Sequence, residues 1–365
     1  MKKTSVILLG ATAIAAAAGI YGLAEGPLSA QGRSLQSPPV EIEMKSSFEV
    51  PAADAQTEAI VTAAQAFLET LDKAQREAAM FAFDDATQRG NWSNFPDGPV
   101  QRAGVMRGDM TENQLAALDA LLSTVMSEDG VNNVRYQLAA EDTLDDGSGG
   151  PNFGSDYYYV SFLGEPSTHA PWMLQFGGHH LAINVTIFGP DVTFSPMLTG
   201  GEPLNIDYEG QQIYITADET TAAQALMDSL SEDQKAQAIV SDTPINLLLG
   251  PGEFGTRVAP EGIKGSDLDD AQKALLSDVI AARLGFINAD DFAAKMEVVE
   301  VELDDTWFGW WGPEGTLGAA YFRVTAPSVI TEYAPQDMDG DPTDHAHNMY
   351  RDPANDYGVA WVEAE

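Results

Sequence analysis

All five histidines of this 365-residue chain fall in two short segments. The first segment holds His169 and the adjacent pair His179 and His180, and the second holds His345 and His347, one residue apart. Imidazole is the commonest protein ligand of transition metals such as zinc, copper and iron, and it titrates near neutrality. The clustering predicts a metal centre assembled from two segments that are far apart in the sequence.

Strand periodicity separates these histidines into unequal candidates. Alternate side chains of a strand share a face, so His345 and His347 should point the same way. The aliphatic residues that follow His180 share the face of His179, as in a core strand, which favours His180 as the third ligand. His179 or a carboxylate is then the candidate for a fourth position. His169 stands in a turn-like stretch before Ala-Pro, and we expect it to lie outside the centre.

Several polar residues near the two segments can complete the site. Glu332 lies on a predicted strand beside the His-x-His strand and is a candidate fourth ligand or general base. Arg351 can bind a substrate carboxylate or stabilise developing negative charge, and its structural alternative is an ion pair with a nearby aspartate. Asp352 is a candidate for the catalytic group or for a supporting role. The residues expected to hydrogen-bond the outward ring nitrogens of the ligands are Asn184, Asn355 and Asp356.

The chain contains no cysteine, so a metal would have to be held by His, Asp, Glu or Asn side chains. Such donors suit zinc, copper or iron, and they leave the identity of the metal open. The leading expectation is hydrolysis of a small ester- or amide-type substrate by metal-activated water. The alternatives are a copper or iron oxidoreductase, a non-catalytic metal- or ligand-binding protein, and histidines that only make structural hydrogen bonds.

A second spacing of acidic residues is typical of calcium loops. Asp337, Asp339 and Asp341 alternate in one short segment. The segment lacks the glycine and the terminal glutamate placement of an EF-hand. We therefore keep calcium as a secondary cofactor expectation beside a solvated acidic turn.

The charge of the chain limits its partners. Lys and Arg number 18 against 56 Asp and Glu, which gives a formal charge of −38. Such a field repels phosphate backbones and excludes nucleic acids as a partner class. The expected partner is a small-molecule substrate, and nothing in the sequence indicates an oligomeric state.

The N-terminus has the pattern of a secretory signal. Lys2 and Lys3 precede an apolar run from Val6 to Ile20, and that run is short for a membrane-spanning helix. We expect export to the periplasm or the medium, with no membrane contact beyond the export signal. The expected division is a signal peptide over residues 1–30, a flexible tether over 31–53 and a single domain over 54–365.

Periodicity along this domain indicates its fold class. A helical period runs from Asp54 to about Phe83, and Thr111 with Gln114 forms a capping box for another helix. Strand-like sequence covers residues 157–194 and returns from Val298 to Trp361, with helical segments between. No internal repeat is apparent. The pattern predicts an α+β fold with a mostly antiparallel sheet core and helices packed before and between the two strand blocks.

Three segments carry a family resemblance. Pro171-Trp172 with residues 178–186 and Gly200-Gly201-Glu202-Pro203 form the central signature, and His345-Ala346-His347 with residues 351–358 form the C-terminal one. Asn91-Trp92, Phe95-Pro96 and Arg102-Ala103-Gly104-Val105 form the N-terminal part. Together they resemble the bacterial domain-of-unknown-function family 3500 over about Ala55 to Val362. The resemblance implies one family unit across the expected domain and assigns no activity. The acidic segment from Asp337 to Asp344 is longer and more charged than the resemblance implies.

Overall fold

The computed structural model describes residues 37–145, 152–253, 258–337 and 340–364. These residues belong to one compact unit, Ser34–Glu365. The expected signal peptide over residues 1–30 lies outside the described residues. Within the described part of the chain, no helix is long and apolar enough to cross a membrane.

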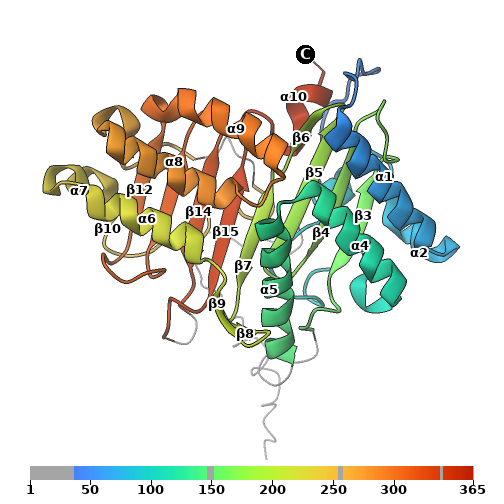
Figure 1. Ribbon diagram of the computed structural model, residues 1–365, viewed down its shortest axis with the longest axis horizontal. Coiled ribbons are helices and arrows are strands. Elements are labelled where there is room, and N and C mark those ends of the chain that lie inside the picture. Colours follow the sequence, from blue (N-terminus) through green and yellow to red (C-terminus); the bar gives the residue numbers. More distant parts are fainter. Residues whose placement is uncertain (1–36, 146–151, 254–257, 338–339, 365) are drawn as a thin grey trace, which may run out of the picture. The chain divides into compact units, whose positions relative to one another are not determined.

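A single large sheet of 13 strands organises the unit (Figure 1). Its main order is β1-β3-β4-β5-β7-β15-β14-β13-β12-β10. Pairing is antiparallel except at the two edges, where β1 runs parallel to β3 and β10 runs parallel to β12. The strands are β1 (Met80–Phe81), β2 (Val105–Met106), β3 (Tyr159–Leu163), β4 (Trp172–Gly178), β5 (Leu181–Phe188), β6 (Asp191–Thr193), β7 (Met197–Gly201), β8 (Asn205–Tyr208), β9 (Gln211–Tyr214), β10 (Ile239–Ser241), β11 (Ile263–Lys264), β12 (Trp307–Trp311), β13 (Tyr321–Thr325), β14 (Ile330–Pro335) and β15 (Ala346–Arg351).

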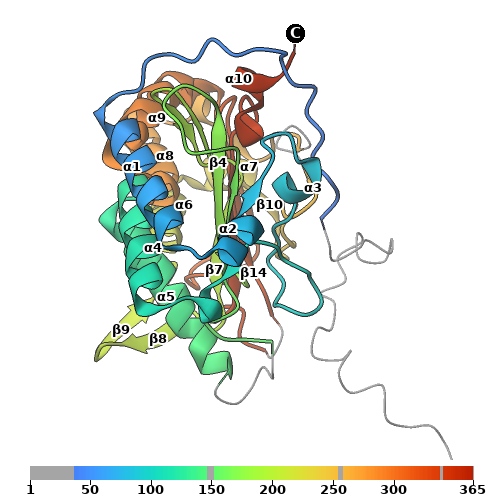
Figure 2. The ribbon, with the colours of Figure 1, turned by 90° about the vertical axis from the view of Figure 1, so that its right-hand side faces the viewer.

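Helices cover one face of this sheet, and loops with short helices cover the other (Figure 2). The helices are α1 (Ala55–Thr70), α2 (Lys73–Ala79), α3 (Ala86–Arg89), α4 (Glu112–Val125), α5 (Glu128–Asp145), α6 (Ala217–Ser229), α7 (Glu232–Ala238), α8 (Asp270–Leu284), α9 (Ala289–Glu302) and α10 (Val359–Val362). The helix-covered face belongs to α1, α4, α5, α6, α8 and α9. The mostly antiparallel α+β fold predicted from the sequence is confirmed.

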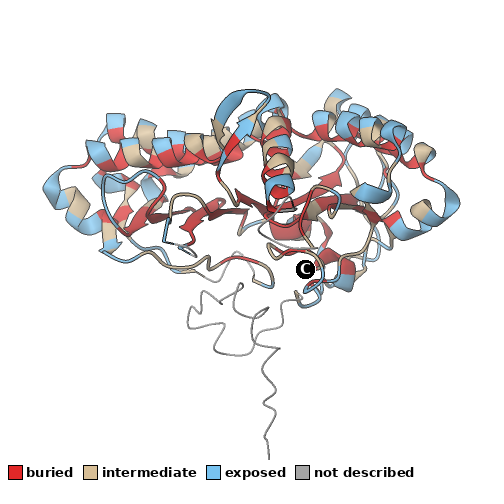
Figure 3. Cartoon of the chain, turned by 90° about the horizontal axis from the view of Figure 1, so that it is seen from below, coloured by how far each residue is buried: buried red, intermediate tan, exposed pale blue. Residues whose placement is uncertain are grey.

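The two faces of the sheet differ in chemistry. The main apolar core lies on the helix side and includes Ile183 and Val185 of β5 and Tyr350 of β15. The alternate residues face the loops, and several of them are polar but still buried, as Asn184 and His347 show. Figure 3 shows the sheet as the most buried layer. Polar groups buried on this loop face require partners, so this face can hold a functional site.

The chain contains an internal duplication that was not apparent in its sequence. The order α1-α2-β1, then β2-α4-α5-β3-β4-β5, recurs as α6-α7-β10, then β11-α8-α9-β12-β13-β14. The sheet order reads the same way from both edges, with β7 and β15 at its centre.

Side-chain contacts support the duplication. In the first half, Gln75 and Gln114 lie in the first turns of α2 and α4, each in a capping box, and hydrogen-bond each other. Gln234 and Gln272 do the same in the second half. The halves therefore share helix caps and topology, a kind of similarity that a direct reading of residue identities misses.

Two local expectations differ from the structure. The helical pattern from Asp54 to Phe83 forms two helices because Asp72, with Gln75, makes a capping box that starts a second one. The second strand block begins at β12, since the valine-rich stretch around Val298 belongs to helix α9. Asn288 caps that helix, and packing of Val299 overrides its strand-like composition. The capping box at Thr111 forms as predicted.

The described end of the expected tether is packed against the unit. Residues 37–53 contain no helix, but Val40 is buried and its N–H donates to Ala86 O over 2.8 Å. Lys45 N donates to Val362 O over 2.9 Å. This segment therefore joins the first half of the domain to its C-terminal end.

Candidate metal centre

The candidate centre lies where β5, β7 and β15 meet at one end of the sheet. His179 and His180 form the two-residue turn between β4 and β5, bounded by the paired residues Gly178 and Leu181. His345 directly precedes β15 and His347 lies within it, opposite Gly200 of β7. The sheet order thus brings together two segments that are about half the chain apart.

The turn before His180 depends on glycine. A Cβ atom on Gly177 would lie 2.4 Å from Leu181 O, and one on Gly178 would lie 2.8 Å from Tyr157 O. Both distances are shorter than a real side chain tolerates, so the two glycines allow close approach of the backbone, as their pairing in the sequence indicates.

His180 adopts a backbone conformation that favours glycine. Its φ angle is +56°. A histidine in the left-handed region costs about 1–2 kcal/mol relative to its ordinary conformations. Such strain persists where the surrounding structure holds it, and it concentrates at functional sites.

Three imidazoles converge beside this turn. Nε2 of His180 lies 2.9 Å from Nε2 of His345. The ring of His347 lies 5.1 Å from the ring of His180 and 5.2 Å from that of His345, between centroids. One nitrogen from each of the three lies within 4.8 Å of the other two. The three side chains are buried, with exposed fractions of 1%, 8% and 8%.

This geometry fits a transition metal ion. Zinc–imidazole bonds of about 2.0–2.1 Å place two ligand nitrogens roughly 2.9–3.4 Å apart for angles between 90° and the tetrahedral value. The His180–His345 pair meets that separation. The residues that would hold the ion are therefore His180, His345 and His347.

The protonation of these rings also suits a metal. Burial, with the neighbouring His179, lowers the pKa of His180 to about 4. Burial likewise lowers the pKa of His345 and of His347 well below the ordinary value for histidine. Neutral imidazoles are the form that binds metal.

Glu141 of α5 reaches the histidines from the helix side. Its Oε1 lies 2.6 Å from Nδ1 of His179 and 3.5 Å from Nδ1 of His180. Burial raises the pKa of Glu141, but the two adjacent histidines outweigh it and lower that pKa to about 2. A negative charge this close to Nδ1 of His180 favours the tautomer protonated there, which leaves Nε2 as the ligand atom.

Glu141 was not predicted from the sequence, although a signal was present. Asn133, Gln137 and Glu141 recur every four residues on one side of α5, and all three are buried. A polar stripe at helical spacing on a buried helix face indicates side chains with partners in the core. His179 Nδ1 and Glu141 also form, with His180, a second group of possible ligands.

Two further residues contact the histidines. Asn94 Nδ2 lies 3.3 Å from Nε2 of His347, which brings the 91–103 segment over the centre from the loop side. Glu202 Oε2 lies 3.6 Å from Nδ1 of His345. Neither was expected from the sequence, because each contact depends on a loop that crosses from another part of the chain.

The other predicted catalytic residues have different partners. Arg351 is fully buried, donates to the carbonyls of Leu249 and Gly250, and pairs with Asp356 over 2.7 Å. It lies four residues beyond His347 on β15, or roughly 13 Å along a strand. Its guanidinium therefore holds a loop and the C-terminal turn.

Glu332 also holds the loop face together. Its carboxylate accepts hydrogen bonds from Tyr321 Oη over 2.6 Å and from the N–H groups of Leu248 and Leu249 over 2.9 and 2.8 Å. Burial raises the pKa of Glu332. The structure does not bring it into the group of converging ligands.

The remaining candidate residues have bonding partners other than the four clustered histidines. Asp352 pairs with Lys295 over 2.7 Å, and Asn355 Oδ1 accepts from Ala360 N. Asn184 bonds Gln175 and Pro196 O within the loop face. His169 is exposed and stands apart from the other four histidines.

The acidic segment is described only in part. Asp339 lies outside the described residues. Asp337 Oδ1 accepts from Gly340 N and Asp341 Oδ1 accepts from Thr343, so both carboxylates stabilise turns.

The fold and these side chains define an α+β protein with a buried, histidine-rich site that can hold a metal ion. The chain belongs to the family described as "Protein of unknown function (DUF3500)", whose sequence profile matches residues 53–359. No curated protein and no solved structure matches the chain.

Proposed function

We propose that this protein is an exported enzyme with one transition metal ion held by His180, His345 and His347. The observation that carries the proposal is the convergence of three buried ring nitrogens within 4.8 Å. Three protein ligands leave a position for water or substrate, which is the arrangement of catalytic rather than structural zinc sites. The strained backbone of His180 supports a functional role in place of a packing role.

The proposed reaction is hydrolysis of a small ester- or amide-type substrate. A bound ion supplies Lewis acidity, polarising a carbonyl and lowering the pKa of a coordinated water toward neutrality. The protein's own contribution is to hold the rings. The Glu141 carboxylate, 3.5 Å from Nδ1 of His180, favours a proton on that nitrogen, and Asn94 contacts His347 from the loop side. Burial excludes bulk water and strengthens electrostatic interactions inside the site.

An oxidoreductase is the second candidate. The observation that favours it is the all-imidazole set of converging ligands, which suits copper as well as zinc. Export would place the site in an oxidising compartment. The export proposal rests on Lys2, Lys3 and the apolar run that follows them.

Activity measurements separate these chemistries. The untagged protein, loaded separately with zinc, copper and iron, is assayed on panels of small esters and amides and for oxygen uptake. The proposal predicts hydrolysis that falls at least 100-fold in His347→Ala and is unchanged in His169→Ala, a matched control because His169 is exposed. Metal-dependent oxygen uptake without hydrolysis would establish the oxidoreductase instead. If neither activity is measured in any metal form, the proposed enzyme function is wrong and only a metal-binding role remains.

A further inference from the structure

A cleft lies on the helix-covered face of the sheet, away from the candidate metal centre. Its volume is about 270 Å³, close to the lower limit of about 300 Å³ for small-molecule sites. Residues of β6, α9, α10 and the end of β15 line it. Tyr350 is one of them; it lies in the main core, three residues beyond His347 and so on the opposite face of β15. The cleft and the metal centre are therefore separate sites.

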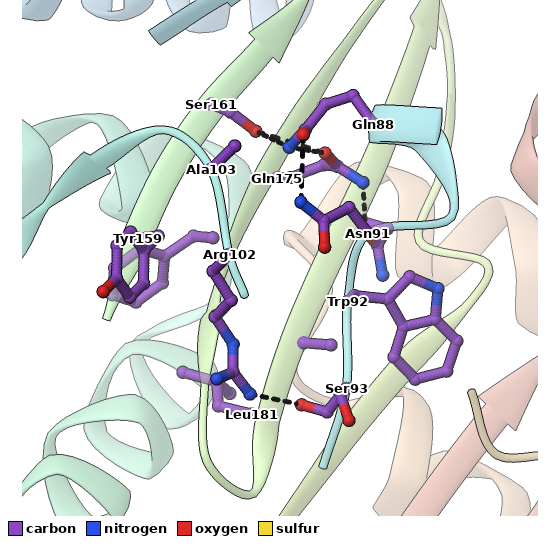
Figure 4. Close-up of a pocket in the computed structure, with 14 residues that line it drawn as sticks. Gln88, Asn91, Trp92, Ser93, Arg102, Ala103, Tyr159, Ser161, Gln175 and Leu181 are labelled. Atoms are coloured by element: carbon purple, nitrogen blue, oxygen red, sulfur yellow. Dashed lines mark hydrogen bonds between the residues drawn. The ribbon is translucent and has the colours of Figure 1, made fainter. Parts of the chain in front are cut away.

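A second cavity, on the loop face, is shown in Figure 4. It holds about 20 Å³, which is room for one water molecule and too little for an organic ligand. Gln88 Nε2 donates to Ser161 Oγ and to Gln175 Oε1, each over 3.0 Å (Figure 4). These bonds hold the covering segment on the sheet, so this cavity has a structural role.

Apolar side chains form much of the surface of the larger cleft. Phe194 and Ile287 are buried in the main core and line it, and Trp361 of α10 lines it as well. Val298 of α9 is 44% exposed, and Ala294, one helical turn before it, is also exposed. A hydrocarbon chain bound in the cleft would therefore bury apolar surface of its own and of the protein.

Two carboxylates in the cleft have only other carboxylates as charged neighbours. Asp191 begins β6, and Asp291 lies in the first turn of α9. Burial, with the charges of Asp54, Asp290 and Asp191, raises the pKa of Asp291 to about 6. Burial with Asp54 also raises the pKa of Asp191. A positive charge bound in the cleft would relieve this repulsion.

The basic residue beside these carboxylates has other partners. Lys295 follows Asp291 by one helical turn, a spacing that allows an ion pair. Its Nζ instead donates to Asp352 Oδ2 over 2.7 Å and to Ser328 O over 2.8 Å. Because Asp352 also lines the cleft, this pair is neutral, and Asp191 and Asp291 give the cleft a net negative charge.

Tyr350 adds a hydroxyl without a partner. Its hydroxyl makes no hydrogen bond with the described residues, and its oxygen is not fully buried although only 2% of the residue is exposed. Since Tyr350 lines the cleft, this oxygen opens into it. A largely buried hydroxyl without a partner costs free energy, so its position indicates a polar group that arrives with a ligand.

The cation that suits this cleft is organic. In the described part of the chain, the carboxyl and imidazole groups that converge within 4.8 Å lie at the histidines, and they do not include Asp54, Asp191 and Asp291. A divalent metal ion needs several oxygen ligands around one point. The apolar walls instead match a ligand with a hydrocarbon part.

We propose that the cleft binds a small organic cation, with its ammonium group held by the carboxylates of Asp191 and Asp291. The hydrocarbon part lies against Val298 and Trp361, and the Tyr350 hydroxyl offers a further acceptor. Hydrogen bonds between an ammonium group and a carboxylate are roughly twice as strong as neutral ones. The formal charge of −38 attracts cations to the whole protein, and the cleft supplies the selectivity. This site is independent of the proposed metal.

Butylammonium tests the inference, because its charge and its chain match the two parts of the cleft. Calorimetric titrations at constant ionic strength compare the wild type with Asp291→Asn, Asp290→Asn and His347→Ala. We expect one saturable site per chain, a loss of affinity of at least tenfold in Asp291→Asn, and affinity within twofold of the wild type in the other two variants. Asp290 is a matched control because it is adjacent and exposed and does not line the cleft.

Two further ligands separate charge from chain. 1-Butanol and butyrate should bind at least tenfold more weakly than butylammonium. Equal affinity for 1-butanol, equal losses in Asp291→Asn and Asp290→Asn, or no saturable binding would overturn the site. If Asp291→Asn fails to fold, Asp191→Asn, at an exposed position of the cleft, must produce the same loss.

The remaining outcomes distinguish other cations and other sites. Displacement of butylammonium by an equal concentration of calcium would assign the carboxylates to an inorganic ion and overturn the inference. Binding lost in His347→Ala would place the ligand at the metal centre and overturn it as well. The metal content of the same samples reports on the proposed function independently.

Discussion

Removal of the Glu141 carboxylate should weaken metal binding although Glu141 is not one of the three proposed ligands. Its Oε1 lies 3.5 Å from Nδ1 of His180, whose Nε2 faces the proposed ion. Adding the width of the imidazole and a metal–nitrogen bond places the carboxylate roughly 7–8 Å from the ion. At an effective dielectric constant of about 20, its attraction for a divalent ion is about 4 kcal/mol as an upper bound.

Measured effects of such outer partners are smaller, about 10- to 100-fold in affinity, or about 1.4–2.7 kcal/mol. Glu141→Gln should therefore weaken metal binding at least tenfold in a competition titration with a chromogenic chelator. Glu128→Gln, at the exposed start of the same helix, removes an equal charge and should change affinity less than twofold. Equal affinities in the wild type and Glu141→Gln would refute the role assigned to this carboxylate.

Two predictions concern buried charges away from the centre. Burial raises the pKa of Glu219 from an ordinary 4.5 to about 7. Between these pH values the folded state keeps the proton that the unfolded state has released. The free energy of unfolding therefore falls by about 3 kcal/mol as the pH rises through this range. In denaturant titrations, Glu219→Gln should abolish that fall, whereas Asp218→Asn, an exposed control, should retain it. Parallel plots of the free energy of unfolding against pH for the wild type and Glu219→Gln would contradict the reasoning. Arg351→Lys should cost about 2–4 kcal/mol of stability, because lysine cannot replace three directed hydrogen bonds, yet leave metal content unchanged. If Arg351→Lys loses its metal while its stability is unchanged, Arg351 belongs to the metal centre and this reasoning is wrong.

Local patterns of the sequence predict local structure well in this protein. The capping box at Thr111 depends on neighbouring residues, and so does the alternation in β5, where Leu181, Ile183 and Val185 join the main core; both appear in the structure. The break at Asp72 and the helix over Val298 show the limit. At Asp72, a helix cap interrupts a continuous helical pattern of apolar residues. Around Val298, the burial of Val299 decides between helix and strand.

In the candidate centre, too, some residues follow from sequence spacing, whereas others are brought in only by tertiary packing. Spacing alone indicates His180, His345 and His347 as a group, because strand periodicity and residue chemistry are local properties. Glu141 and Asn94 join them only through the packing of α5 and the 91–103 segment on opposite faces of the sheet. Arg351 and Glu332 lie on neighbouring strands, but loop carbonyls and amides take up their polar groups.

The metal content of the untagged protein tests the central claim most directly. Elemental analysis of the wild type should give about one transition metal ion per chain, with the same value for His169→Ala. His347→Ala should retain less than ~0.2 ion per chain, because two imidazoles hold such ions weakly. Less than ~0.2 ion in the wild type after incubation with zinc, copper and iron, or equal content in the wild type and His347→Ala, would contradict a metal centre at these histidines.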